Sequence, residues 1–287
     1  MAKGTIYCLL LCYFGNITFF RMKFQLLYLL ISLCSLSLNG IGQGSCEYEN
    51  YFYYTTSAFK ENGDGNTSKA IELFEKAFNS VEHPLGYDLA VCLNLSVELK
   101  DNIRSLKYAS TLAKGGVKMD YFLQFEHEAW FKEFQENYDT YKNHFRSHYQ
   151  TKLRQKLIQL RHQDSLYNVD YHNWRKGKIS MSYEQLLSGA EAIRDSLISI
   201  IKTHGFPHEK NSGFYSDGES VGQFPLGIVI HHLFQLGDRS LHKSLDKISC
   251  NGSLRPVEIT SLKGVQGFGD STGIPDEMAI RWERYSR

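Results

Sequence analysis

The sequence predicts an all-α protein. Apolar residues recur at steps of three and four along successive segments, which is the period of one helix face. Stretches that contain glycine or proline separate these segments, and no stretch shows the strict alternation of a half-buried strand. Behind a hydrophobic leader we therefore expect helix pairs in the N-terminal half, packed on an irregular helical domain in the C-terminal half.

The composition fits a chain with a packed core and argues against several classes of protein. Of the 287 residues, 42% are hydrophobic and 22% are charged, so the chain is not expected to be disordered. The 32 Lys and Arg residues balance the 31 Asp and Glu residues, which argues against a strongly basic nucleic-acid binder. The 6 cysteines form no CxxC pair, so neither a zinc site nor a disulfide-built miniprotein is expected.

Residues 1–42 contain no Asp or Glu and hold two apolar stretches, 6–20 and 24–38. The second stretch has the basic start, the apolar core and the small-residue cleavage site of a secretory signal, and it is short for a membrane span. We therefore expect a signal peptide over 22–42, an upstream extension over 1–21, and export to the periplasm or the extracellular space. A membrane hairpin made of both stretches and a lipid anchor at Cys46 are the alternatives.

Cleavage after Gly42 would leave three cysteines: Cys46, Cys92 and Cys250. In an oxidising compartment an odd number means that one thiol is unpaired, lipidated or buried. A Cys46–Cys92 disulfide is one option. Cys92 lies in an apolar helical run, however, and this position favours plain core packing.

Residues 43–118 predict two helix pairs that repeat with a period near 35 residues. The first pair keeps small and large residues at characteristic positions: Ala58, Ala70, Phe74, Ala77 and Pro84. In the second pair Ser105 takes the place of Ala70, and Leu112 that of Ala77. The segment resembles tetratricopeptide repeats, which run near 34 residues. An ordinary helical subdomain, with small residues where helices cross, is the alternative.

Residues 119–150 are rich in aromatic side chains and predict connecting helices. Five of these side chains repeat at helical spacing: Phe131, Phe134, Tyr138, Tyr141 and Phe145. They could form a ligand platform, but we expect them to form the core seam that joins the two halves.

Residues 151–287 predict three longer helices over 153–167, 182–204 and 224–236. Gly205 and Pro207 end the second of these helices. The segment 211–220 is expected to be an exposed loop, either as a binding loop or as a connector. Pro275 is expected to begin a last helix.

Several short motifs follow one another in this half: Gln163-Asp164, Gly205-Phe206-Pro207, Ile228-Val229-Ile230-His231-His232 and Gln266-Gly267-Phe268-Gly269. In this order they resemble an uncharacterised family of exported bacterial proteins, known only as a domain of unknown function. The resemblance places Asp164, Pro207, His231 or His232, and Gln266 on signature positions, and it implies no activity. The chain departs from the pattern where Arg255-Pro256-Val257-Glu258 stands in place of an expected Asp-Arg pair.

His231 and His232 are the most conspicuous polar residues in an apolar run. Neighbouring helix positions point about 100° apart, so the two side chains cannot face one site. A buried imidazole needs a hydrogen-bond partner, and Asp164 is the acid that we expect. Such a pair can act as a general base, or it can simply pin two helices together.

No metal or cofactor is expected. His144 and His148 have i,i+4 spacing without a further ligand motif, and the sequence has no phosphate-binding or nucleophile-elbow motif.

Two functions are compatible with these patterns. The preferred one is a protein- or peptide-binding module that uses the helix-face residues Tyr51, Tyr54 and Phe59. The alternative is a hydrolase-like or small-ligand site with a His–Asp pair. Its candidate residues all lie in the C-terminal domain: Asp164, His204, Pro207, His208, His231, His232 and Gln266. The expected partner is a protein or peptide and not a nucleic acid, with membrane contact only through the leader or a lipid on Cys46.

Overall fold

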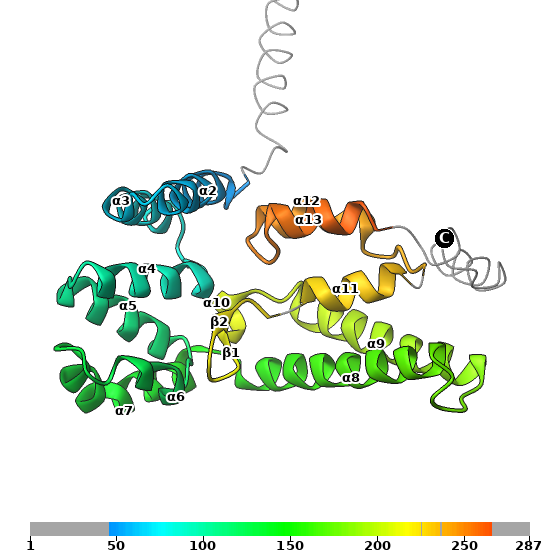
Figure 1. Cartoon of the computed structure of the whole chain (residues 1–287). Coiled ribbons are helices and arrows are strands. Elements are labelled where there is room, and N and C mark those ends of the chain that lie inside the picture. The colour runs from blue at the N-terminus through cyan, green and yellow to red at the C-terminus, as the bar shows by residue number, and fades with distance from the viewer. Residues whose placement is uncertain (1–45, 225, 236, 266–287) are drawn as a thin grey trace, which may run out of the picture. The chain divides into compact units, whose positions relative to one another are not determined.

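The structure, a computed structural model, describes residues 46–265 except 225 and 236. It confirms the all-α class, because the described residues form mainly α-helices: α2 (Glu49–Gly63), α3 (Thr67–Phe78), α4 (Gly86–Glu98), α5 (Asn102–Lys114), α6 (Met119–Phe122), α7 (Phe131–His148), α8 (Thr151–Arg175), α9 (Tyr183–His204), α10 (Glu209–Ser212), α11 (Leu226–Gln235), α12 (Leu245–Cys250) and α13 (Pro256–Lys263) (Figure 1). Two short 3-10 helices are also present: Leu123–Phe125 directly follows α6, and His242–Ser244 directly precedes α12. The predicted leader and the helix after Pro275 lie outside the described residues.

The N-terminal half, α2 to α7, is built from neighbouring helices that pack in sequence order. Helix α2 packs on α3, α4 on α5, and α5 on α7. Their small and large residues meet in one core, where Ala70 and Phe74 of α3 are fully buried. The predicted aromatic seam begins in this core with Phe131 and Phe134, while Tyr138 and Tyr141 pack on its edge. The rings therefore hold helices together and do not form an open platform.

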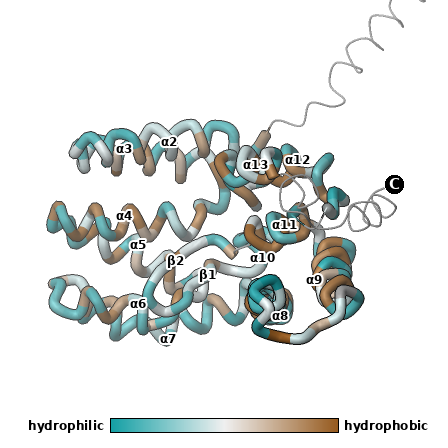
Figure 2. The backbone as a smooth tube through the Cα atoms, turned by 45° about the vertical axis from the view of Figure 1, so that its right-hand side comes forward, coloured by the Kyte–Doolittle hydropathy of each residue, from teal (hydrophilic) through white to brown (hydrophobic). Residues whose placement is uncertain are grey.

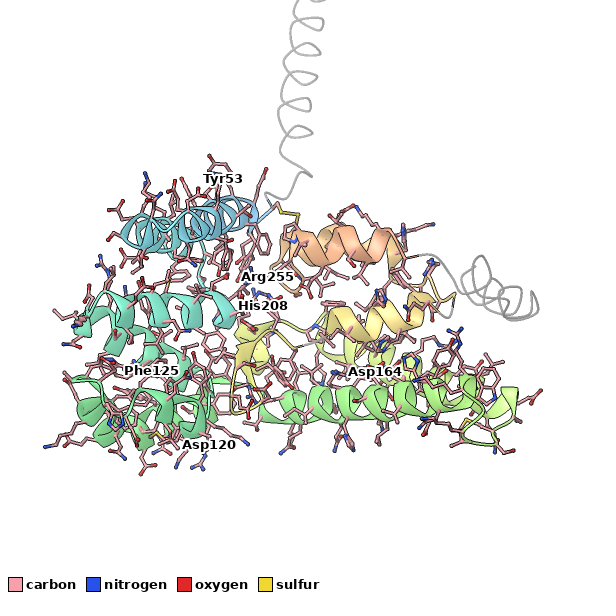
Figure 3. The ribbon with its side chains drawn as sticks, viewed as in Figure 1. Tyr53, Asp120, Phe125, Asp164, His208 and Arg255 are labelled. Atoms are coloured by element: carbon pink, nitrogen blue, oxygen red, sulfur yellow. A yellow bond between two sulfur atoms is a disulfide. The ribbon has the colours of Figure 1, made fainter. Side chains whose placement is uncertain are left out.

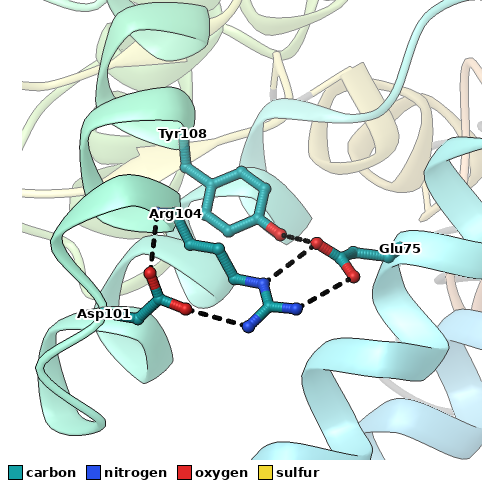
Figure 4. Close-up of polar contacts among 4 residues, drawn as sticks. All are labelled: Glu75, Asp101, Arg104 and Tyr108. Atoms are coloured by element: carbon teal, nitrogen blue, oxygen red, sulfur yellow. Dashed lines mark hydrogen bonds and ion pairs between the residues drawn. The ribbon is translucent and has the colours of Figure 1, made fainter.

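A polar network at the edge of this core ties α3 to α5 (Figure 4). The Arg104 Nε donates to Glu75 Oε1 at 3.1 Å, and its Nη1 donates to Asp101 Oδ2 at 2.9 Å. Asp101 also caps α5, because its Oδ1 accepts the Arg104 backbone N–H at 3.0 Å. The Tyr108 hydroxyl adds a bond to Glu75 at 3.2 Å. The start of α5 is thereby fixed against α3.

The C-terminal half, α8 to α13, has a second core. Helix α8 packs on α9 and α11, and α11 packs on α13. Hydrophobic stretches run along α9 and α11 (Figure 2), and residues such as Leu157, Leu197 and Val229 have almost no exposed surface. A capping box at Ser182 and Gln185 begins α9, and Gly205 follows its last residue.

The segment predicted as an exposed loop over 211–220 is more ordered and more buried than expected. Strands β1 (Tyr215–Ser216) and β2 (Val221–Gly222) have two residues each and pair antiparallel across the loop 217–220. Phe214, just before β1, is 2% exposed and inserts into the core of the N-terminal half. Its backbone N–H donates to the Gly115 carbonyl at 2.7 Å. This segment therefore joins the two halves.

The cysteine pairing differs from the option considered above. Cys46 forms a disulfide with Cys250 and not with Cys92. Cys92 is buried with a free thiol in the N-terminal core, which confirms its packing role. The bridge links the residue three positions before α2 to the last residue of α12, a partner that sequence spacing could not identify.

Candidate functional site

Helix α11 carries the two candidate histidines, and most of its other side chains are apolar. Val229, Ile230 and Leu233 are buried in the C-terminal core. His231 and His232 are both half-buried. Consecutive helix positions diverge by about 100°, and the two imidazoles accordingly have different surroundings.

His232 faces α8, where it meets a buried acid. Its Nδ1 lies 2.9 Å from Asp164 Oδ1, and Arg161 Nη1 donates to Asp164 Oδ2 at 3.2 Å. Asp164 is 1% exposed and lies on the side of α8 that faces α11 (Figure 3). The predicted hydrogen bond between Asp164 and one of the two histidines is therefore present. It fixes the rotation of α11 about its axis.

His231 faces a groove between α11 and α13. The groove has a volume of about 410 Å³ and is open to solvent. Its lining is mostly apolar and comes from both helices: Gly227, Ile228, His231, Val257, Glu258, Ser261 and Leu262. Val257 is 71% exposed and Ile228 is 44% exposed, and these two large apolar side chains lie on opposite walls of the groove.

Helix α13 forms the opposite wall and is fixed by local bonds at its start. Pro256 occupies its first position, where a missing N–H costs nothing. Glu258 Oε2 accepts the Arg255 backbone N–H at 2.7 Å. A Cβ at Gly227 would lie 2.7 Å from Glu258 Oε1, so the glycine lets this carboxyl approach α11 without moving aside.

Two titratable groups of the groove have shifted pKa values. Burial lowers the pKa of His231, and the charge of His232 lowers it further. Burial raises the pKa of Glu258 against the effect of Arg255. Both shifts favour the neutral form, which suits an apolar lining.

The start of α13 is also tied to the N-terminal half. Arg255 Nη2 donates to Asp88 Oδ1 at 2.7 Å, and the Tyr51 hydroxyl donates to Asp88 Oδ2 at 2.6 Å. Asp88 has no exposed surface, and each of its two carboxylate oxygens accepts one of these hydrogen bonds. The Arg255 guanidinium lies 5.1 Å from the Tyr87 ring centre on α4. Arg255 lies where the two halves meet, a region that we call the joint (Figure 3).

A second buried acid at the joint is Glu209. Its Oε2 accepts the Gly86 backbone N–H at 2.7 Å, and burial raises its pKa to about 8. Two neighbouring imidazoles, His83 and His208, lie with ring centres 5.9 Å apart. Burial lowers their pKa values to about 4 and about 3, respectively. All three groups are therefore neutral near pH 6.5.

The residues predicted for partner binding in the N-terminal half are not equally accessible. Tyr51 has no exposed surface, so its side chain serves the joint and cannot contact a partner in this conformation. Tyr54 and Phe59 are half-buried, and the Phe59 ring packs on Phe74 at 5.1 Å. The exposed ring on this helix is Tyr53, at 68% (Figure 3).

Apart from the bonded pair Asp164 and His232, the residues predicted for one C-terminal pocket do not share a single pocket. Pro207 and His208 line a cavity of about 10 Å³, which holds one water at most. His204 is half-buried in the last turn of α9 and lines none of the pockets described above. His231 lines the groove, whereas Asp164 and His232 do not. Gln266 lies outside the described residues.

Among the described residues, no group of three or more His, Cys, Asp or Glu side chains could hold a metal ion. His144 and His148 stack with ring centres 3.9 Å apart on the surface of α7. No helix within 46–265 is both long enough and apolar enough to cross a bilayer.

Sequence reasoning missed the second wall of the groove. The predicted site residues do not include those of helix α13, such as Val257, Glu258 and Ser261. Pro256 at the first helical position is a local signal for this helix. No local signal identifies the partner of Asp88, because Arg255 is 167 residues away.

Comparison of the chain with protein families, with curated proteins and with solved structures finds no match in any of the three. The residues themselves must therefore support any functional conclusion.

Proposed function

We propose that this chain is an exported helical module that binds a peptide or a protein, and that the groove between α11 and α13 is the binding site. The observation that carries the proposal is the pair of exposed apolar walls. Val257 and Ile228 face solvent on two different helices of one groove of about 410 Å³. Concave sites with a mostly apolar lining and a few polar groups are typical of binding sites.

The dimensions of the groove support a peptide as the ligand. At 1.5 Å per residue, α11 is about 15 Å long and α13 about 12 Å long. Two or three turns of an amphipathic helix match this length, and such helices place apolar anchors at every third or fourth residue. His231, Glu258 and Ser261 supply polar groups on the walls, which would fix the orientation of a bound peptide.

The leader and the disulfide support export. The apolar stretch over 24–38 has the features of a secretory signal. A disulfide between Cys46 and Cys250 suits an oxidising compartment, because cytosolic thiols are kept reduced. The helix pairs α2–α3 and α4–α5 are consistent with tetratricopeptide-like repeats. Under this interpretation the N-terminal half adds a second binding surface.

The test is selection of binding peptides against the full chain, followed by fluorescence anisotropy with the enriched peptides. We expect apolar, helix-forming peptides to be enriched. The substitutions Val257→Glu and Ile228→Glu should each weaken their binding by about tenfold or more, because each places a charge in an apolar contact. Ile103→Glu is the matched control, since Ile103 is 85% exposed on α5 and lies outside the groove.

Equal binding by Val257→Glu and the unsubstituted chain would contradict the proposed site. So would a selection that enriches no peptide dependent on Ile228.

A small-ligand or hydrolase-like site is the second candidate, and one observation favours it. The groove contains Ser261, His231 and Glu258, which are the side-chain types of nucleophilic catalysis, and the His232–Asp164 bond holds α11 in place behind them. Turnover of p-nitrophenyl acetate that is lost in both His231→Ala and Ser261→Ala would support this candidate over peptide binding. Turnover unaffected by either substitution would exclude it.

A further inference from the structure

Helix α8 has an apolar face that no element of the described structure covers. Ile158 is 47% exposed, and Leu166 and Val169 are each 54% exposed. The opposite face of α8 is buried in the C-terminal core through Leu157, Leu160 and other residues. In Figure 3 side chains project downward from α8, away from the other ribbons.

The exposed apolar residues form one stripe. At 100° per residue, Ile158, His162, Leu166 and Val169 fall within a sector of about 80° that is centred opposite Asp164. Their spacing of four, four and three residues adds up to eleven, a repeat that keeps side chains on one face of a helix. The other positions on this face, Gln155, Gln159 and Asn173, are uncharged. An uncharged face with three large apolar side chains is poorly suited to permanent contact with water.

Charged residues flank the stripe in an ordered way. Lys152 and Lys156 lie along one edge in the first half of α8, and Asp170 lies along the same edge in the second half. Arg161 and His172 lie along the other edge. When two identical helices pack antiparallel, each edge meets the same edge of its partner in reverse order. Lys156 of one copy then meets Asp170 of the other, twice.

A parallel arrangement would bring unlike edges together, so Lys156 and Asp170 would not meet. Arg161, on the other edge, is already bonded to Asp164. The antiparallel arrangement is therefore the one that pairs Lys156 with Asp170.

We infer that a second copy of this chain packs on the exposed face of α8, antiparallel and about a two-fold axis. In the register that pairs Lys156 with Asp170, Ile158 of one copy lies opposite Val169 of the other, and His162 lies opposite Leu166. The contact is isologous, so it closes at two copies and does not propagate. It uses α8 and not the α11–α13 groove, so the dimer leaves the proposed binding site free.

The size of the contact predicts a weak dimer. The stripe from Ile158 to Val169 is about 17 Å long, at 1.5 Å per residue. A seam of this length is smaller than the interfaces of about 1,600 Å² that stable complexes bury. We expect a dissociation constant of the order of 10 μM.

The test is sedimentation of the full chain over a concentration series from about 1 to 300 μM, a range that spans the expected dissociation constant. The unsubstituted chain should pass from monomer to dimer. Leu166→Lys should raise the dissociation constant by about tenfold or more, because it places an unpaired charge in the seam. Ile103→Lys, which changes an exposed apolar residue on α5, should leave the dissociation constant unchanged.

Charge reversal tests the antiparallel arrangement. Lys156→Glu and Asp170→Lys should each raise the dissociation constant by about threefold or more, and the double variant should return it to within about twofold of the original value. A monomer at every concentration would overturn the inference. So would a dimer that persists in Leu166→Lys, or two charge reversals whose effects simply add.

Discussion

His231 and His232 are adjacent on one helix but have different roles, because their side chains point in different directions. His232 is bound to a buried carboxylate and secures α11 against α8. His231, about 100° away around the same helix, faces the groove with a pKa that burial lowers. A ligand in the groove would therefore meet a neutral imidazole that can donate or accept one hydrogen bond. The anchoring histidine supports this orientation without contact with the ligand.

Three buried titratable residues at the joint predict how stability depends on pH. Glu209 has a folded pKa of about 8, above its usual value of 4.5, so its contribution to stability is lost as the pH rises towards 8. His83 and His208 have folded pKa values of about 4 and about 3, below 6.5, so their contributions are lost as the pH falls below 6.5. These opposite slopes predict maximal stability near pH 6.5.

Glu209→Gln isolates the alkaline side of this profile. Between pH 6.5 and 8 we expect the unsubstituted chain to lose about 2 kcal/mol of unfolding free energy through Glu209, since each pH unit is worth about 1.4 kcal/mol. The glutamine variant should lose none of this. Urea unfolding at several pH values measures the difference, with the exposed Glu219→Gln as control. Identical slopes for Glu209→Gln and the unsubstituted chain would show that Glu209 does not titrate as described.

At the residue scale the sequence could predict local pairs but not distant ones. The bond between Asp164 and a histidine was predictable because each of these polar residues lies in an otherwise apolar helix face and requires a partner. Asp88 offers the same kind of signal within α4. Its partner Arg255 and the Glu209–Gly86 bond depend on how the two halves meet, however, and no pattern in a single helix contains that information.

At the scale of elements, the turn after α10 depends on Gly213. This residue has φ of +76°, and a Cβ there would lie 2.5 Å from the Gly115 carbonyl oxygen. The close approach lets Phe214 bond to Gly115 and enter the N-terminal core. Glycine content predicts a loop over 211–220, and the segment is non-helical after Ser212, but glycine content does not show that Gly213 and Phe214 are buried. Phe214, an apolar residue between turn residues, is the local signal that this part of the segment is buried.

Gly205 provides a matched comparison for Gly213. It has nearly the same backbone angles, with φ of +73°, but nothing lies within 4 Å of its Cβ position. Gly205→Ala should cost only backbone strain, about 1–3 kcal/mol. Gly213→Ala should cost at least about 2 kcal/mol more, because its methyl group also collides with a backbone carbonyl. Urea unfolding of both variants measures this difference, and equal costs would show that the turn relaxes freely.

Helix boundaries were more predictable than helix partners. The predicted helix 182–204 agrees with α9 to within one residue, because a serine cap and a terminal glycine mark its ends. Helix α8 continues eight residues beyond its predicted end at Tyr167. The repeat of apolar residues is weaker after Tyr167, because that part of α8 contacts the core through few residues, such as Tyr171.

At the scale of the whole molecule, the described chain is tied together by contacts between residues far apart in sequence. The Cys46–Cys250 disulfide joins residues separated by 204 positions. Tyr48 reinforces it, because its backbone N–H donates to the Cys250 carbonyl at 3.1 Å. A thioether-linked lipid on Cys46 would require the same sulfur atom, so the disulfide and the lipid anchor exclude each other. Three cysteines with unknown fold allow three pairings, which is why the sequence left this choice open.

The disulfide should be the largest single contributor to the stability of this arrangement. Closing a loop of 204 residues in the unfolded chain removes entropy worth about 5 kcal/mol at 25 °C in the chain-entropy model. We expect reduction with dithiothreitol to lower the unfolding free energy by an amount approaching this value, measured by urea unfolding with and without reductant. The Cys46→Ser/Cys250→Ser double variant should match the reduced chain and should not respond to dithiothreitol, since Cys92, the cysteine that remains among the described residues, is buried and free. Unfolding midpoints that are the same in both conditions for the unsubstituted chain would mean that the two halves are held by the joint alone, through Asp88, Glu209 and their partners.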